Sequence, residues 1–132
     1  SIVQINGEFS LNFLSEITID GQGFILSDCE GAEKYIFDNT SPNWKYLVQN
    51  FDLLIEVHEF IIPGIKKQLS DIFYTTHTIR SIFSIRDELR PLYFANPLLS
   101  NLSQKKKIAL LSESRPTKME WIYLERSNIS NA

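Results

Sequence analysis

Carboxylates and one histidine gather at the ends of two apolar stretches of this chain, and they are the residues best suited to chemistry. Asp28 and Glu30 follow the first stretch, and Glu56 and His58 close the second. Histidine is the side chain whose ordinary pKa lies closest to neutral pH, so His58 beside carboxylates suits the role of a general base. A buried unpaired charge is costly, so Glu56 within a strand indicates a partner or a function.

Simpler roles compete with chemistry at the neighbouring polar residues. Glu30 and Glu33 stand where carboxylates stabilise the N-terminus of a helix, which is the commonest reason for such residues. His77 begins a predicted strand, and we expect it to be a structural histidine.

The two apolar stretches must position the candidate side chains. Residues 24–26 and 52–60 are almost continuously apolar, which is typical of strands buried on both faces of a parallel sheet. Neighbouring strands lie about 4.8 Å apart, and ligands bind outside the carboxyl ends of the strands in an open α/β sheet. If the two strands are neighbours, Asp28 converges with Glu56 and His58 on one pocket.

Helices alternate with strands along the rest of the chain. This alternation predicts βαβ units and an α/β fold, and the alternating pattern of the last strand predicts an antiparallel or edge position. The predicted helices cover residues 11–17, 30–37, 43–49 and 65–73, with further helical and turn pieces from 87 to about 113. The predicted strands cover residues 2–5, 24–26, 52–60, 76–85 and 119–125.

Length and composition indicate one globular domain, which we place at residues 1–126, followed by a polar tail at 127–132. The chain has 132 residues, of which 43% are hydrophobic and 22% are charged. A net charge of −3 without a basic stripe argues against a nucleic-acid partner. No stretch approaches the roughly 20 apolar residues of a membrane helix. The single cysteine excludes an internal disulfide and fits a reducing compartment, so we expect a cytoplasmic protein.

Two common catalytic motifs are missing from the sequence. Gly21-Gln22-Gly23 comes before a predicted strand, whereas a phosphate-binding glycine loop follows a strand and opens a helix. No serine or cysteine lies in the Gly-x-Ser-x-Gly pattern of a nucleophile elbow. The sequence therefore offers no phosphate cradle and no nucleophile of that kind.

The acidic motif after the first strand resembles that of a known family. Residues 28–33, Asp-Cys-Glu-Gly-Ala-Glu, are similar to the Asp-x-Glu-Gly-x-Glu motif of FkbM-like class I S-adenosylmethionine-dependent methyltransferases, which closes the fourth strand of their sheet. Residues 52–60 resemble the fifth strand, and segments 73–77 and 113–123 resemble the later hairpin region and the final strand. The resemblance implies the C-terminal half of a Rossmann-like methyltransferase sheet, mostly parallel with an antiparallel final strand.

The resemblance also implies roles for the acidic residues. Asp28 and His58 would be catalytic, and Asp28 and Glu30 would face the cofactor S-adenosylmethionine. Glu56 and Glu59 would lie on the side of the substrate, a small molecule or a glycan that is methylated on oxygen. The family's glycine-rich loop and ribose-binding carboxylate have no counterpart in this sequence, so we expect the chain alone to bind the cofactor weakly or not at all.

Two alternatives from other functional classes remain open. A half sheet leaves an open edge and uncovered apolar surface, which favours a non-catalytic module that dimerises through that edge. We therefore expect a homo-oligomer, unless residues 2–17 fold back over that flank. A metal-dependent hydrolase using Asp28, Glu56 and His58 is a weaker hypothesis, because these residues lack a dedicated ligand spacing, and we expect no bound metal.

Overall fold

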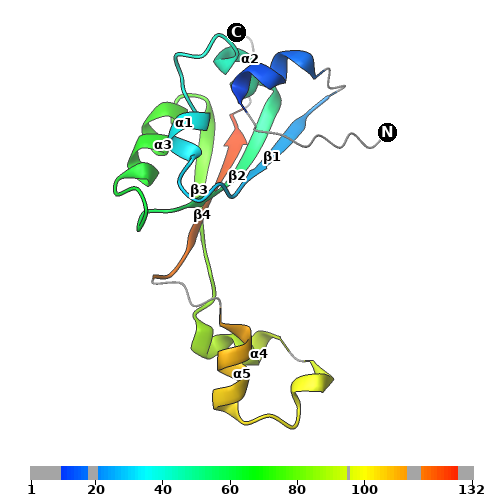
Figure 1. The fold of residues 1–132 in the computed structure, drawn as a ribbon. Helices are drawn as coiled ribbons and strands as arrows, with labels where there is room; N and C mark the ends of the chain where they lie inside the picture. The colour runs from blue at the N-terminus through cyan, green and yellow to red at the C-terminus, as the bar shows by residue number, and fades with distance from the viewer. Residues whose placement is uncertain (1–9, 18–20, 95, 113–116, 128–132) are drawn as a thin grey trace.

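A four-stranded mixed sheet forms the centre of the computed structural model, which describes residues 10–17, 21–94, 96–112 and 117–127 (Figure 1). The strands are β1 (Gly23–Ser27), β2 (Phe51–Val57), β3 (His77–Phe83) and β4 (Glu120–Arg126), and their order across the sheet is β1-β2-β4-β3. β1 and β2 pair in parallel, whereas β4 pairs antiparallel with both β2 and β3. The α/β class is confirmed. The antiparallel last strand is confirmed as well. β1, β2 and β3 run in the same direction, but β4 inserts between β2 and β3, so the sheet is mixed and only one of its three strand pairs is parallel.

Short helices cover one face of this sheet and enclose the hydrophobic core. They are η1 (Leu11–Glu16), α1 (Glu33–Ile36), α2 (Trp44–Asn50) and α3 (Ile65–Phe73), and α1 and α3 lie side by side in Figure 1. Alternate residues of the strands point toward them. The core contains Leu53, Ile55 and Val57 of β2, Ile122 and Leu124 of β4, and Ile65, Leu69 and Phe73 of α3.

The opposite face of the sheet is left open by the described helices. The strand register places Leu26, Leu54 and Tyr123 side by side on that face. Phe24 is 58% exposed and Leu26 is 62% exposed. The prediction that residues 24–26 are buried on both faces is therefore wrong, because among the described residues β1 is an edge strand and the core lies against the other face only.

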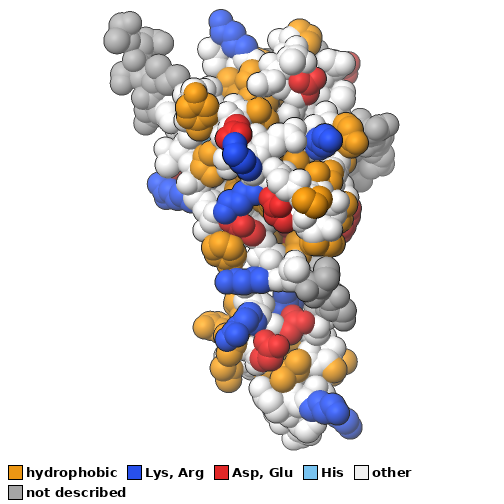
Figure 2. Space-filling model, turned by 90° about the vertical axis from the view of Figure 1, so that its left-hand side faces the viewer, with side chains coloured by type: hydrophobic (Ala, Val, Ile, Leu, Met, Phe, Trp, Pro, Cys, Tyr) orange, Lys and Arg blue, Asp and Glu red, His pale blue; other side chains and the backbone are white. Residues whose placement is uncertain are grey.

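Helices between β3 and β4 form a separate lobe at the far end of these strands (Figure 1). This helical lobe consists of η2 (Asp87–Leu89), α4 (Arg90–Tyr93), η3 (Pro97–Leu99) and α5 (Gln104–Leu111). Arg90 holds it together, because its Nε lies 3.1 Å from Asp87 Oδ1 and its Nη1 donates a hydrogen bond to the carbonyl of Leu111. No described residue of the lobe is buried. Apolar side chains on its surface can be seen in Figure 2, and the large exposed ones are Leu92, Tyr93, Phe94, Leu98 and Leu110.

The predicted elements agree with the structure best in the middle of the chain. The helix at 65–73 is confirmed at both ends, and those at 43–49 and 11–17 are confirmed to within a residue, the latter as a 3-10 helix. Residues 2–17 were the segment that could fold back over the open flank of the sheet. The described part of it, η1, packs against α2 in the core instead, and Phe24 and Leu26 stay exposed. The predicted strand at 2–5 and the tail beyond residue 127 lie outside the described residues. In the described part of the chain, no helix is long and apolar enough to cross a membrane.

Candidate functional site

A tight left-handed turn follows β1 and sets the positions of the first acidic residues. Glu30 has φ +51° and Gly31 has φ +99°, which is backbone geometry that right-handed helices do not adopt. The helix predicted to begin at residue 30 therefore starts only at Glu33. As a result, Glu30 lies in the turn rather than at a helix N-terminus, and Glu33 is rotated into the interior of the protein.

The end of β2 supplies the second half of the site. Glu56 is 3% exposed and His58 is 0% exposed. The strand ends at Val57 rather than at the predicted residue 60, because the backbone N–H groups of Ile61 and Ile62 both turn back to the carbonyl of His58. The parallel pairing of β1 with β2 places this turn beside the turn that follows β1. The predicted convergence of the two stretches is confirmed.

Glu33 holds the imidazole ring of His58 through a hydrogen bond with Nδ1. Its Oε1 lies 3.0 Å from His58 Nδ1 and also accepts the backbone N–H of Cys29 at 3.1 Å. The Glu33 side chain is fully buried. An ionised carboxylate can only accept hydrogen bonds, so Nδ1 carries the donated proton, and in neutral His58 the lone pair lies on Nε2.

Three further carboxylates surround the other ring nitrogen. The distances to His58 Nε2 are 3.5 Å from Asp28 Oδ1, 3.6 Å from Glu30 Oε2 and 3.5 Å from Glu56 Oε2. These distances exceed those of ordinary hydrogen bonds. Buried Nε2 makes no hydrogen bond with any residue that the structure describes. We call Asp28, Glu30, Glu33, Glu56 and His58 together the His58 cluster.

The His58 cluster has a solvent side and a buried side. The side chains of Asp28 and Glu30 are 41% and 65% exposed, whereas those of His58 and Glu33 are completely buried. A molecule arriving from solvent therefore meets Asp28 and Glu30 before it meets His58. The arrangement concentrates negative charge around one imidazole, which suits a cationic ligand or the transfer of a proton.

Glu59 does not join the cluster. Its two carboxylate oxygens accept the backbone N–H groups of Gly64 and Lys66, each at 2.8 Å, at the N-terminus of α3. Carboxylates are favoured at this end of a helix because they satisfy otherwise unpaired N–H groups. The structure thus gives Glu59, which we expected on the substrate side, a helix-capping role.

Glu33 was not among the predicted site residues, although it makes the closest contact with His58. The sequence suggested that it stabilises a helix N-terminus from the surface. Its place as the last residue of the Asp-x-Glu-Gly-x-Glu pattern was the signal that could have found it.

His77 has the structural role that we expected. Its Nε2 lies 3.0 Å from the carbonyl of Phe51, and its Nδ1 lies 2.8 Å from the hydroxyl of Thr76. Burial lowers the pKa of His77, and the hydrogen bond to Phe51 offsets part of that effect. A neutral ring with its proton on Nε2 donates to the carbonyl of Phe51. The Thr76 hydroxyl has one proton and two acceptors within reach, His77 Nδ1 and the carbonyl of Phe73.

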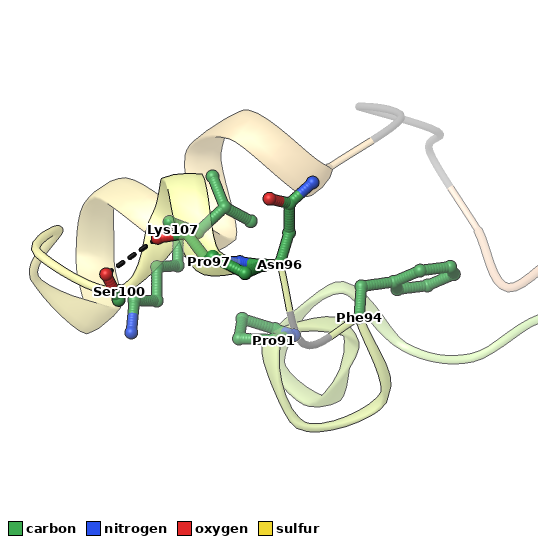
Figure 3. A pocket seen from close by; sticks show the side chains of 7 residues that line it. Pro91, Phe94, Asn96, Pro97, Ser100 and Lys107 are labelled. Atoms are coloured by element: carbon green, nitrogen blue, oxygen red, sulfur yellow. Dashed lines mark hydrogen bonds between the residues drawn. The ribbon is translucent and has the colours of Figure 1, made fainter.

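The helical lobe contains a hollow, shown in Figure 3, and two of its polar groups already make hydrogen bonds within the lobe. It has a volume of about 380 Å³ and is lined by Pro91, Phe94 and Lys107 among others. Asn96 Oδ1 accepts the N–H of Leu98, and the Ser100 hydroxyl donates to the carbonyl of Pro97. Asn96 and Phe94 point in different directions in Figure 3. The hollow therefore lacks the convergent polar groups of a small-molecule site.

A comparison of the chain with protein-family models, with curated proteins and with solved structures finds no match.

Proposed function

We propose that this chain forms the C-terminal half of an FkbM-like S-adenosylmethionine-dependent methyltransferase that acts on a hydroxyl group of a small molecule or a glycan. This half would contribute to both the methyl-donor side and the acceptor side of the pocket. The proposal rests on the convergence of Asp28, Glu56 and His58 at the carboxyl ends of two parallel strands. Ligands of open α/β sheets bind in this position. The resemblance assigns these same residues to the pocket, and the antiparallel last strand agrees with what it implies.

The charge of the His58 cluster fits the cofactor that the resemblance implies. S-adenosylmethionine supplies a methyl group attached to a positively charged sulfonium. The exposed carboxylates of Asp28 and Glu30 favour a positive charge beside them. A glycine-rich loop and a ribose-binding carboxylate have no counterpart in the sequence, so most of the contacts to such a cofactor must come from outside this chain.

Asp28 is the residue of the cluster that contacts the acceptor in this proposal. It is exposed to solvent, and its Oδ1 lies 3.5 Å from the buried Nε2 of His58. Asp28 orients the acceptor hydroxyl and shares its proton as the oxygen becomes bonded to the methyl group. His58 then receives that proton on Nε2, and Glu33 stabilises the resulting imidazolium through Nδ1.

Nuclear magnetic resonance of the isotopically labelled chain with added S-adenosylmethionine tests the proposal. We expect saturable shifts confined to residues 27–33 and 56–60, with a dissociation constant in the millimolar range, or about −4 kcal/mol. Asp28→Asn should weaken them, whereas Asp71→Asn, an exposed carboxylate on α3, should not. Absence of localised shifts at saturating cofactor would overturn the proposal. Micromolar binding would show that the donor site does not depend on elements outside this chain.

A second candidate is a non-catalytic module that dimerises through the sheet edge. The exposed Phe24 and Leu26 on β1 favour it, because a free strand edge with apolar side chains is a surface that pairs with another chain. This candidate predicts a stable oligomer without any response of the His58 cluster to the methyl donor.

A further inference from the structure

We propose that the His58 cluster binds a divalent transition-metal ion through Nε2 of His58 and the carboxylates of Asp28 and Glu30. One ligand atom from each of these three residues lies within 4.8 Å of the other two. The inference concerns metal binding by the chain itself and does not rest on the proposed methyl transfer.

The buried nitrogen of His58 is the observation that distinguishes this cluster from ordinary surface carboxylates. Nε2 points toward Asp28 and Glu30, is completely buried, and makes no hydrogen bond with the described residues. In neutral His58, the lone pair of Nε2 faces carboxylate oxygens, which also carry lone pairs. A cation between them turns this repulsion into attraction, because every one of these atoms can then act as a ligand.

The distances around Nε2 agree with those between ligands of one ion. Two ligands that each lie about 2.1 Å from a tetrahedral zinc ion are separated by about 3.4 Å. Nε2 lies 3.5 Å from Asp28 Oδ1 and 3.6 Å from Glu30 Oε2. These separations are too long for good hydrogen bonds, and they are close to the distance between two ligands of one tetrahedral ion. Glu56 Oε2 also lies 3.5 Å from Nε2, but it is not one of the three atoms that lie within 4.8 Å of one another.

Glu33 completes the arrangement as the outer partner of the histidine. Histidines that bind metals commonly donate their second ring N–H to a carboxylate, which fixes the tautomer and raises the basicity of the ligating nitrogen. The 3.0 Å contact between His58 Nδ1 and Glu33 Oε1 has this geometry. Glu33 is in turn held by the backbone N–H of Cys29, so the ring orientation is set before an ion arrives.

The ligand types indicate the class of ion. One imidazole nitrogen with carboxylate oxygens suits Zn²⁺ or Mn²⁺, whereas Cu⁺ prefers sulfur ligands and Mg²⁺ prefers oxygen and water alone. The exposure of Asp28 and Glu30 leaves the outer side of the ion open to solvent or to a further ligand. A bound ion occupies the lone pair of Nε2, so the metal-loaded chain cannot use His58 as a base.

Calorimetric titration of the intact chain with ZnCl₂ and, separately, with MnCl₂ tests the inference. We expect one ion per chain. Glu30→Gln should weaken binding at least about tenfold, as is typical when one partner of a metal site is changed. Asp71→Asn is the matched control, because Asp71 is also an exposed carboxylate, and it should leave affinity unchanged within about twofold.

The two histidines give a second pair of variants that does not depend on Glu30. His58→Gln should abolish binding, and His77→Gln, which changes the other buried histidine, should retain it. Mn²⁺ should also broaden the resonances of residues 27–33 and 56–60 selectively. No binding of either ion at millimolar concentration, or affinity that Glu30→Gln and His58→Gln leave unchanged, would overturn the inference. Zn²⁺ binding that is lost only in Cys29→Ser would do so as well, because it would place the ion on the thiol.

Discussion

Glu33 is the side chain on which the geometry of His58 depends most directly. It is fully buried and accepts hydrogen bonds from both His58 Nδ1 and the backbone of Cys29. Removing Glu33 leaves two N–H groups without their acceptor, and each buried unsatisfied donor typically costs about 1–3 kcal/mol. We therefore expect Glu33→Ala to lower the free energy of unfolding by about 3 kcal/mol in urea titrations.

Two further variants test whether the loss of stability is specific to the buried carboxylate of Glu33. Glu33→Gln retains an oxygen that can accept from Nδ1, so it should cost less than Glu33→Ala. Asp71→Ala removes an exposed ion pair with Lys67 and should cost less than about 1 kcal/mol. A loss of the same size for Glu33→Ala and Asp71→Ala would contradict the buried position of Glu33.

His77 makes the stability of the protein depend on pH. Burial lowers its pKa in the folded state from the ordinary value of 6.5, so the unfolded chain takes up a proton more readily. Its contribution is present in full above pH 6.5 and declines as the pH falls from 6.5 toward the lowered value. We expect His77→Gln to flatten the dependence of unfolding free energy on pH in this window. Parallel curves for both proteins would show that the pKa of His77 is the same in the folded and the unfolded chain, which would contradict the prediction.

For single residues, the sequence predicted which side chains lie together in the His58 cluster better than it predicted what each of them does. Parallel strands end at one edge, and this rule placed Asp28 beside Glu56 and His58 correctly. Glu33 could not be assigned, because the left-handed turn at Glu30 determines which way the next helix faces. Gly31 indicates a tight turn in the sequence, but it does not indicate which way the helix after the turn faces.

Gly31 lies between β1 and α1, and a small substitution there should disturb the His58 cluster more than at other element boundaries. It has φ +99°, and a Cβ there would lie 3.0 Å from Ile61 Cγ2, in the turn that follows His58. Backbone strain of this kind costs about 1–3 kcal/mol. We expect Gly31→Ala to lower stability by that amount and to shift the resonances of residues 56–60. Gly21→Ala, also at positive φ but with nothing near its Cβ, separates the effect of φ from that of the close contact.

Helices and strands with a clear local sequence pattern were predicted well, but the burial of their side chains was not. In α3, Ile65, Leu69 and Phe73 follow helical spacing, and the preceding Gly64 marks where the helix starts. β1 has an equally apolar sequence, yet Leu26 is largely exposed. Whether an apolar strand lies at the centre or at the edge of a sheet depends on which other strands pair with it, and a single strand's sequence does not record this.

The open edge of β1 predicts self-association of the whole molecule. Burying the apolar surface around Phe24 and Leu26 contributes about 25 cal/mol per Å², which favours a dimer over a monomer of 15.3 kDa. Analytical ultracentrifugation at tens of micromolar protein should therefore give a mass above that of the monomer. Leu26→Lys should restore the monomer, whereas Leu98→Lys on the helical lobe should not. A wild-type mass of one chain would rule out the dimerising module.

The attachment of the helical lobe has a consequence for how fast the chain folds. The N–H of Ser84 donates to the carbonyl of Met119, so β3 and β4 come together where the lobe leaves and re-enters the sheet. The lobe therefore acts as a long loop inside a β-hairpin, and closing a loop costs about 0.6 kcal/mol more with each doubling of its length. Replacing residues 85–118 with an Asn-Gly turn should accelerate refolding in stopped-flow measurements by roughly tenfold or more, provided that the hairpin closes before the rate-limiting step. The unfolding rate should change little, because no described lobe residue contributes to the buried core.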